Sequence, residues 1–165
     1  MDVTIRRYRP ADRETVLALH YAGVEQIDAD FFAATGLPDD GNADTDFDDT
    51  DMDDIPGRYL DDGGEFLVGE IDGRVVTMGG LMKETPASAL VKRMRTLPGL
   101  QGHGYGRRLL DHLEQRAREL GYAELLADPL TTNTGARRFY ERAGYQEIHQ
   151  KQVGIFTVAM YRKLL

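Results

Sequence analysis

The distribution of apolar and polar residues along the chain predicts a series of short strands. Most of these stretches alternate apolar and polar residues, which places successive side chains on opposite faces of a sheet. The stretches expected as strands are residues 3–9, 65–71, 74–82, 88–97, 125–127, 145–150 and 155–163. Within 88–97 one face should carry Leu90, Lys92, Met94 and Thr96, and the other Val91, Arg93, Arg95 and Leu97.

Apolar residues at helical spacing predict three helices between these strands. The first begins near Asp12, its expected N-cap, and the others cover residues 105–120 and 134–143. Strands and helices are mixed along the chain, which ends in strands. We therefore predict an α/β (α+β) fold with a mostly antiparallel sheet. A length of 165 residues matches one domain, which we assign to residues 1–165.

The segment from residue 38 to 64 is rich in aspartate. Mutual repulsion predicts either a mobile loop or short helical turns held by apolar anchors. The candidate anchors are Phe47, Met52, Ile55 and Tyr59. Residues 44–48 have the opening spacing of a calcium-binding loop. Asp49 stands where that loop requires glycine, and Ile55 where it requires glutamate, so we do not predict a calcium site.

The composition is that of an acidic protein with a net charge of -8. Such a surface repels phosphates, so we expect no nucleic-acid partner. Abundant aspartate with scarce lysine is typical of adaptation to high salt, and an ordinary acidic protein is the alternative. The absence of cysteine excludes disulfides and cysteine nucleophiles. No apolar run is long enough to span a bilayer and no signal peptide is recognisable, so we expect a cytoplasmic protein without membrane contact.

A glycine-rich turn joins the predicted strand 88–97 to the helix that follows. Its sequence from residue 98 is Pro-Gly-Leu-Gln-Gly-His-Gly-Tyr-Gly, and Arg107 and Arg108 come next. Such a turn leaves backbone N–H groups unpaired, and glycines let a ligand approach them closely. The helix dipole adds partial positive charge, and together these features suit a pyrophosphate. The alternative is that the glycines serve packing alone.

A second segment runs from Asn133 to Tyr145 over the last predicted helix. Its apolar positions, Ala136, Phe139, Tyr140 and Ala143, share one helix face. On spacing alone, Tyr140 would be a core residue whose hydroxyl reaches the rim. The two segments together carry more information than either does separately.

Together they resemble the GCN5-related N-acetyltransferase (GNAT) family. Residues 101–106 fit its Gln/Arg-x-x-Gly-x-Gly/Ala signature, and the later segment fits its Asn…Ala…Phe-Tyr…Gly-Phe/Tyr pattern. The resemblance covers about residues 66–145 and implies a sheet whose fourth and fifth strands splay apart to admit acetyl-CoA. It places the pyrophosphate on the backbone of Gln101, Gly102, His103, Gly104, Tyr105 and Gly106. It also implies that main-chain groups of Met94 and Thr96 bind the pantetheine arm, and that Asn133 and Tyr140 lie beside the thioester.

The resemblance further implies that Tyr140 is the general acid that protonates the leaving thiolate. A backbone N–H of the splayed strand could stabilise the oxyanion. Without cysteine, we expect direct attack of the amine in a ternary complex. The sequence does not single out a base: we interpret Glu84 and Asp128, which flank the site, and Glu65 and Glu70 as surface carboxylates. His20, His112 and His149 lack metal-ligand spacing and are expected at the surface or rim, so no metal is predicted.

The expected acceptor is a primary amine on a small molecule, a protein N-terminus or a lysine. The acidic region 21–59 would favour cationic acceptors, unless its acidity reflects salt adaptation. The alternatives to an enzyme are a CoA-binding regulatory module and a protein-interaction module without turnover. The sequence leaves a monomer and a homodimer equally open.

Overall fold

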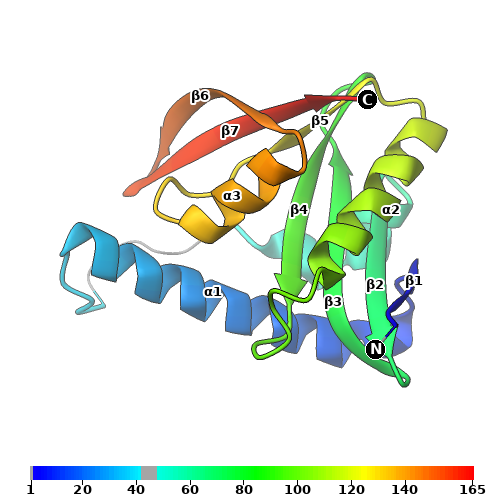
Figure 1. Cartoon of the computed structure of the whole chain (residues 1–165), viewed down its shortest axis with the longest axis horizontal. Coiled ribbons are helices and arrows are strands. Elements are labelled where there is room, and N and C mark those ends of the chain that lie inside the picture. The colour runs from blue at the N-terminus through cyan, green and yellow to red at the C-terminus, as the bar shows by residue number, and fades with distance from the viewer. Residues whose placement is uncertain (1, 42–47) are drawn as a thin grey trace.

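A computed structural model describes residues 2–41 and 48–165, which form one mixed sheet with helices on both faces (Figure 1). The strands are β1 (Thr4–Arg7), β2 (Glu65–Ile71), β3 (Arg74–Lys83), β4 (Ser88–Thr96), β5 (Glu124–Ala127), β6 (Gln146–Val153) and β7 (Phe156–Leu164). The helices are α1 (Arg13–Thr35), α2 (Tyr105–Glu119) and α3 (Thr134–Arg142), with short turns η1 (Pro10–Asp12), η2 (Thr50–Asp53) and η3 (Pro56–Leu60). The α+β prediction is confirmed. Within the described residues, no helix is long and apolar enough to cross a membrane.

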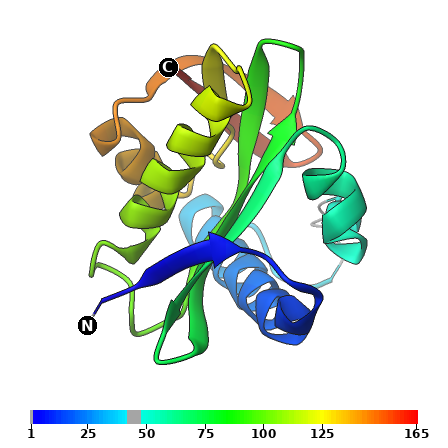
Figure 2. The same ribbon diagram turned by 90° about the vertical axis from the view of Figure 1, so that its right-hand side faces the viewer.

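The sheet has seven strands in the order β1-β2-β3-β4-β5-β7-β6. Every neighbouring pair is antiparallel except β4 and β5, which are parallel. Helices α2 and α3 pack on one face, and α1 with the short turns covers the other (Figures 1 and 2). Each face therefore has its own apolar cluster, as a sheet covered on both sides requires.

The sheet divides in its middle, between β4 and β5. These strands pair only where Ser88–Leu90 of β4 meets Glu124–Leu126 of β5. Beyond Leu90, β4 keeps only its pairing with β3, while β5 remains paired with β7. The predicted splay is therefore confirmed, and it leaves a gap beside residues 91–96 of β4.

Helix α1 bridges this gap on one face of the sheet. Val16 and Leu19, in its first half, are buried in the cluster with β2 and β3. Phe31, in its second half, packs edge-on against Phe156 of β7, with ring centroids 4.6 Å apart. The helix thus ties the two halves of the sheet together, and its middle turns pass over the gap. Asp12 is the N-cap of this helix, as predicted, but its side chain makes no capping bond and accepts hydrogen bonds from Arg6 and the Arg9 N–H.

A β-bulge interrupts β4 at the gap. Gly80 of β3 pairs with Lys92 of β4, and Met78 pairs with Arg95. Two steps along β3 therefore correspond to three along β4, so β4 contains one additional residue there. Arg93 adopts a left-handed backbone (φ 58°), which is rare for a residue other than glycine. The predicted alternation fails at this point, because the bulge puts Val91 and Met94 on the same face, toward α2. Arg95 faces α1, where a Cβ on Gly23 would overlap its side chain.

The short turns between residues 50 and 60 lie against this bulge. Met52, Ile55 and Tyr59 are buried, which confirms the prediction of anchored helical turns for this part. Phe47 lies outside the described residues, as do residues 44–46, the first positions of the rejected calcium loop. No group of residues in the described part of the chain could hold a metal ion.

A buried ion pair fixes the turns to β4. Asp51 of η2 accepts hydrogen bonds from Arg93 Nε (3.0 Å) and from the Tyr59 hydroxyl. Burial alone would raise the pKa of Asp51, but the bonds from Arg93 and Tyr59 outweigh it and lower the pKa to about 2. The pair therefore stabilises both the left-handed residue and the turns in the folded state.

Replacing Asp51 should reveal how much this ion pair contributes to the free energy of unfolding and how that contribution depends on pH. The lowered pKa means that the contribution of Asp51 is complete above its unfolded pKa of about 4 and is lost as the pH falls toward 2. We expect Asp51→Asn to lower the free energy of unfolding at pH 6 by about 2 kcal/mol. The loss should shrink as the pH falls below about 4, as measured by urea unfolding followed by circular dichroism.

The matched control is Asp111→Asn, which removes the exposed ion pair with Arg107. Surface pairs contribute little, so its effect should stay below about 1 kcal/mol across the same range. If Asp51→Asn and the wild type lost stability in parallel as the pH falls, the buried pair would not be a source of stability.

Candidate active site at the gap in the sheet

The glycine-rich turn between β4 and α2 presents open backbone to solvent. Gly99, Gly102 and Gly104 have positive φ values of 89°, 80° and 83°, and a Cβ on any of them would meet no atom within 4 Å. In the described part of the chain, the N–H groups of residues 101–107 donate to no protein acceptor. Unpaired donors at the start of a helix form an anion-binding site.

Side chains of the turn hold this backbone in place. Gln101 Nε2 donates to the Thr96 carbonyl (3.3 Å), and His103 Nδ1 lies 3.1 Å from the Leu100 carbonyl oxygen. The His103 ring also stacks on Tyr105. The imidazole is therefore engaged within the turn, and His103 offers its backbone N–H to a ligand.

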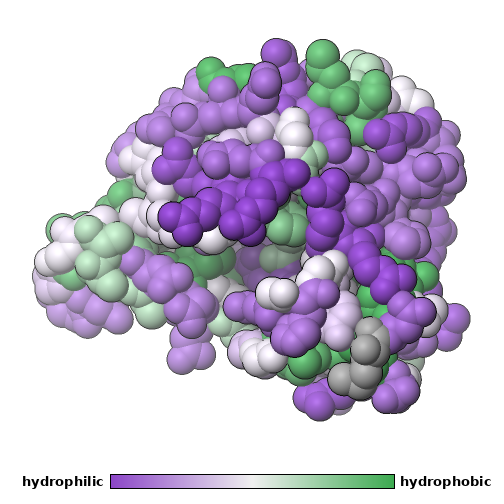
Figure 3. Space-filling view, in the orientation of Figure 1, coloured by the Kyte–Doolittle hydropathy of each residue, from purple (hydrophilic) through white to green (hydrophobic). Residues whose placement is uncertain are grey.

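Arginine side chains surround the turn. Arg107 pairs with Asp111 and Arg108 with Asp2, which reduces their charge toward an incoming anion. Arg138 and Arg142 of α3 are exposed, and no ion pair engages them within the described residues. Strongly hydrophilic side chains gather over α3 and the beginning of α2, with less polar atoms recessed between them (Figure 3).

The gap exposes main-chain groups of β4. The Leu97 N–H bonds to β3, so by alternation the main-chain groups of Met94 and Thr96 point away from β3 and into the gap. Their carbonyl oxygens accept side-chain hydrogen bonds, from Arg95 Nη1 to Met94 (2.9 Å) and from Gln101 to Thr96. An extended chain in the gap could therefore pair with β4 as an added strand.

Tyr140 of α3 is buried in the cluster beneath α2, where its ring lies edge-on to Phe139 and Tyr145. Burial, reinforced by the negative charge of Asp128, raises the pKa of its hydroxyl well above the ordinary value. Tyr140 therefore remains a proton donor throughout the neutral range. Asn133 caps the same helix, its side chain accepting a bond from the Ala136 N–H (3.1 Å).

Asp128 follows β5 directly, on the wall of the gap opposite β4. It is only partly exposed, and burial raises its pKa against the opposing charges of Lys92, Lys151 and Arg93. Interpreting it as a surface carboxylate is therefore wrong. The same correction applies to Glu65, which is buried and paired with Arg7 and Arg116.

The prediction that His20 of α1 lies at the surface or rim is also wrong, because its side chain is fully buried against the bulged strand. Its Nε2 lies 3.1 Å from Asp49 Oδ2, and its Nδ1 has no hydrogen-bond partner among the described residues. Burial lowers its pKa, and the bond to Asp49 offsets this only in part. His112, His149 and Glu84 are exposed as predicted, and Glu70 is half-buried against Arg6.

The sequence-predicted residues thus fall into two groups beside the gap. The turn 101–106 continues from β4, with Met94 and Thr96 on that strand, while Asn133 and Tyr140 belong to α3 on the same face of the sheet. Sequence reasoning missed the other face, where Arg93 and Arg95 meet α1 and η2. The available signal was the presence of two arginines within the predicted strand 88–97.

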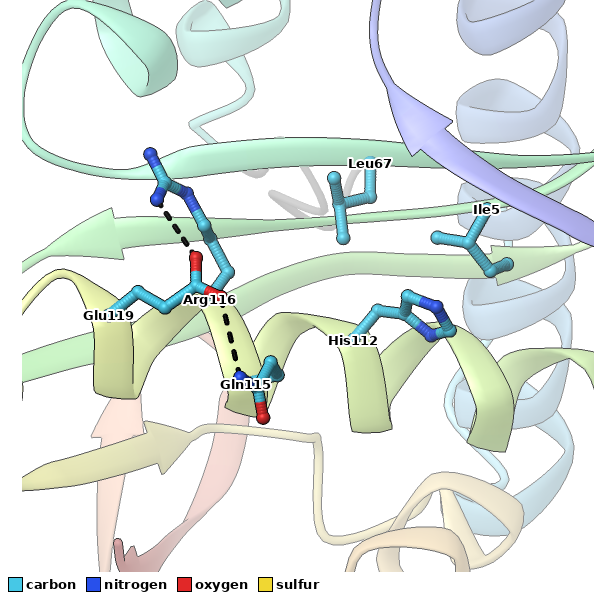
Figure 4. A pocket seen from close by; sticks show the side chains of 6 residues that line it. All are labelled: Ile5, Leu67, His112, Gln115, Arg116 and Glu119. Atoms are coloured by element: carbon cyan, nitrogen blue, oxygen red, sulfur yellow. Dashed lines mark hydrogen bonds and ion pairs between the residues drawn. The ribbon is translucent and has the colours of Figure 1, made fainter.

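A separate hollow of about 200 Å³ lies on the opposite side of α2, away from the gap (Figure 4). Its lining is Ile5, Leu67, His112, Gln115, Arg116 and Glu119. Arg116 and Glu119 pair with each other across its rim. Such a shallow hollow is smaller than usual ligand pockets, and none of the predicted site residues lines it.

Comparison with known proteins agrees with this geometry. The family model described as "Acetyltransferase (GNAT) family" matches residues 24–145. A GNAT-family acetyltransferase from Staphylococcus aureus Mu50 superposes with a TM-score of 0.77, at 20% identity over 99% of each chain. YncA, a putative acetyltransferase from Salmonella typhimurium solved with acetyl-CoA, gives 0.76 at 21% identity over 99% of this chain and 94% of its own.

A ribosomal-protein-alanine N-acetyltransferase from Brucella melitensis gives a TM-score of 0.73, at 21% identity over 98% of this chain and 99% of its own. At these identities the structural matches establish the fold alone. A comparison with curated protein sequences found no match.

Proposed function

The chain belongs to the GNAT acetyltransferase family, and on this premise we propose that it moves an acetyl group from acetyl-CoA to a primary amine. We assign this activity to residues 1–165 as a single domain. The observation that carries the proposal is the run of unpaired N–H groups at residues 101–107, set directly beside the gap between β4 and β5.

The residues present fit acetyl-CoA as a substrate. Its pyrophosphate would accept bonds from the backbone of Gln101 to Gly106, where the glycines leave room for it. Its pantetheine arm would extend along β4 and pair with the main-chain groups of Met94 and Thr96. Asn133 and Tyr140 would then lie at the thioester end, beside the face of the sheet that α3 covers.

The reaction transfers two protons and replaces the C–S bond of the thioester with the C–N bond of an amide. The amine nitrogen attacks the thioester carbon, and we assign Asp128 to remove its proton, because burial raises the pKa of this carboxyl toward the working range of a base. The C–N bond forms first and gives a tetrahedral intermediate, and the C–S bond breaks when this intermediate collapses. Tyr140 then donates its phenolic proton to the leaving thiolate, and the proton held by Asp128 returns through solvent to the tyrosinate, which restores both groups. The products are an amide and free CoA.

A bulky side chain at Gly104 should abolish acetyl-CoA binding. Gly104→Val would place Cβ in the open space over the unpaired N–H groups, at a backbone angle that valine resists. Titration calorimetry should show binding by the wild type and at least a tenfold weaker affinity in the variant, in both low and high salt.

Gly121→Val is the matched control, because Gly121 has φ 88°, equally open space and a place at the far end of α2. It should share the backbone strain and keep the affinity. No binding by the wild type at either salt concentration would remove the acetyltransferase assignment.

Removing the phenol of Tyr140 should slow turnover without weakening acetyl-CoA binding. General acid catalysis typically contributes a factor of about 10² or more, so Tyr140→Phe should lower kcat by roughly that factor. The release of free CoA thiol measures the rate, and calorimetry measures the affinity. An unchanged kcat would exclude Tyr140 from proton transfer.

Replacing Asp128 tests the base. Asp128→Asn should lower kcat/KM about 10²-fold at neutral pH, with the residual activity rising with pH as more free amine forms. Glu84→Gln is the control, since this carboxylate is exposed and should leave the profile unchanged. Wild-type rates in Asp128→Asn would exclude this residue. Binding of acetyl-CoA without turnover on any amine would instead favour the regulatory alternative.

A further inference from the structure

We propose that Arg95 binds a carboxylate of the acceptor, so that the acetylated amine belongs to a molecule of the amino-acid class. This inference rests on the acetyltransferase function proposed above and specifies its second substrate. It concerns the face of the gap that α1 covers, which the sequence did not single out.

Arg95 lies at the mouth of the gap. Its Nη1 donates to the Met94 carbonyl, one of the main-chain groups of β4 that point into the gap. On the other side it lies against Gly23, in the part of α1 that bridges the two halves of the sheet, and any Cβ there would overlap Nε. The guanidinium is therefore held between β4 and α1, on the opposite face of the sheet from α2 and its glycine-rich turn.

In the part of the chain that the structure describes, the positive charge of Arg95 is not balanced by a counterion. Within the described residues no carboxylate forms an ion pair with it, and its buried Nε lacks any hydrogen-bond partner. Its neighbour Arg93 is fully engaged by Asp51 and adds repulsion. Burying an uncompensated charge is costly unless a ligand completes the interaction. A carboxylate matches the planar donors of a guanidinium and would complete it.

The opposite wall of the gap carries the complementary charge. Asp128 lies on that wall. Burial raises the pKa of Tyr140 most, and the charges of Asp128 and Arg95 shift it in opposite directions, Asp128 upward and Arg95 downward, so both charges act at the Tyr140 hydroxyl. An amino acid presents an ammonium and a carboxylate together. Its ammonium would face Asp128, which removes the proton, and its carboxylate would face Arg95. Lys92, which precedes the bulge in β4, also acts electrostatically on Asp128 and makes the β4 wall still more positive.

The same charges disfavour purely cationic acceptors such as polyamines and amino sugars. Of the aspartates described in the turns beside β4, only Asp51 has its charge compensated by a cation, Arg93. The carboxylates of Asp49 and Asp48 lie against His20 and Thr50, which leave their negative charge in place because burial lowers the pKa of His20. A purely cationic acceptor would still leave Arg95 without a carboxylate, which is why we expect it to be disfavoured.

The test compares amino acids with their carboxamides, which differ only in the carboxylate, and with two unrelated amines that lack a carboxylate. Amino acids, their carboxamides, spermidine and glucosamine are assayed for CoA release with the wild type and Arg95→Gln. Calorimetry of the amino acids and carboxamides in the presence of CoA gives a second readout that needs no turnover. Charged hydrogen bonds of this kind predict a preference of about 10- to 100-fold for the amino acid, lost in Arg95→Gln.

Two further variants separate charge from position. Gly23→Ala keeps the charge and favours the helix, but its Cβ displaces the guanidinium, so the preference should also fall. Arg74→Gln removes an exposed arginine of the β2–β3 hairpin and should change nothing. Acetyl-CoA affinity, measured in every variant, reports whether the protein is folded.

The outcomes distinguish the two proposals. Equal or better use of carboxamides or spermidine by the wild type would overturn the role of Arg95 while leaving the acetyltransferase intact. A preference for amino acids that survives in Arg95→Gln would do the same. If no amine is acetylated, the proposed function fails. The calorimetric comparison then decides whether the site still binds carboxylates through Arg95.

Discussion

The structure depends on the loss of pairing between β4 and β5 beyond Leu90. Backbone N–H and C=O groups inside a protein are almost always paired, so a central strand with one open edge is a costly arrangement. Here the cost is contained, because β3 holds the other edge of β4 and α1 ties the separated halves together. The open edge leads directly into a turn whose N–H groups are also unpaired. A ligand that is extended at one end and anionic at the other satisfies both features, which is the physical reason why this fold suits acetyl-CoA.

The bulge in β4 connects the two faces of the gap. It rotates the strand so that Met94 packs toward α2 while Arg93 and Arg95 turn toward α1. Without the additional residue, strict alternation would place Val91 and Arg95 on the same face. The left-handed backbone of Arg93 is compensated by the bonds that its side chain makes to Asp51. Part of the acidic segment is therefore structural: it fixes the conformation of the strand from which the site is built.

Much of the fold was predictable from the sequence, since hydrophobic periodicity and glycine positions located the strands, the start of α1 and both ends of α2 and α3 to within a few residues. The turn 101–106 was recognisable because its glycines alternate with other residues within one short stretch of the chain. The bulge was not, because a bulge depends on register between strands, which one strand's sequence does not contain. His20, Glu65 and Asp128 were misjudged for a related reason. Each is a polar residue buried by contacts with distant segments, such as Arg7 and Arg116 around Glu65.

The net charge of the whole surface and the local charge at the gap are two different properties, and the composition reports only the first. A net charge of -8 describes the whole surface, yet the β4 wall of the gap carries Lys92, Arg93 and Arg95. Long-range attraction of cations by the surface and local recognition at the gap can therefore act in opposite directions. Local charges decide binding, since they act at short range and in a less polar medium where screening by salt is weak. A protein adapted to high salt would gain solubility from its aspartates and still select its acceptor by the few charges that line the gap.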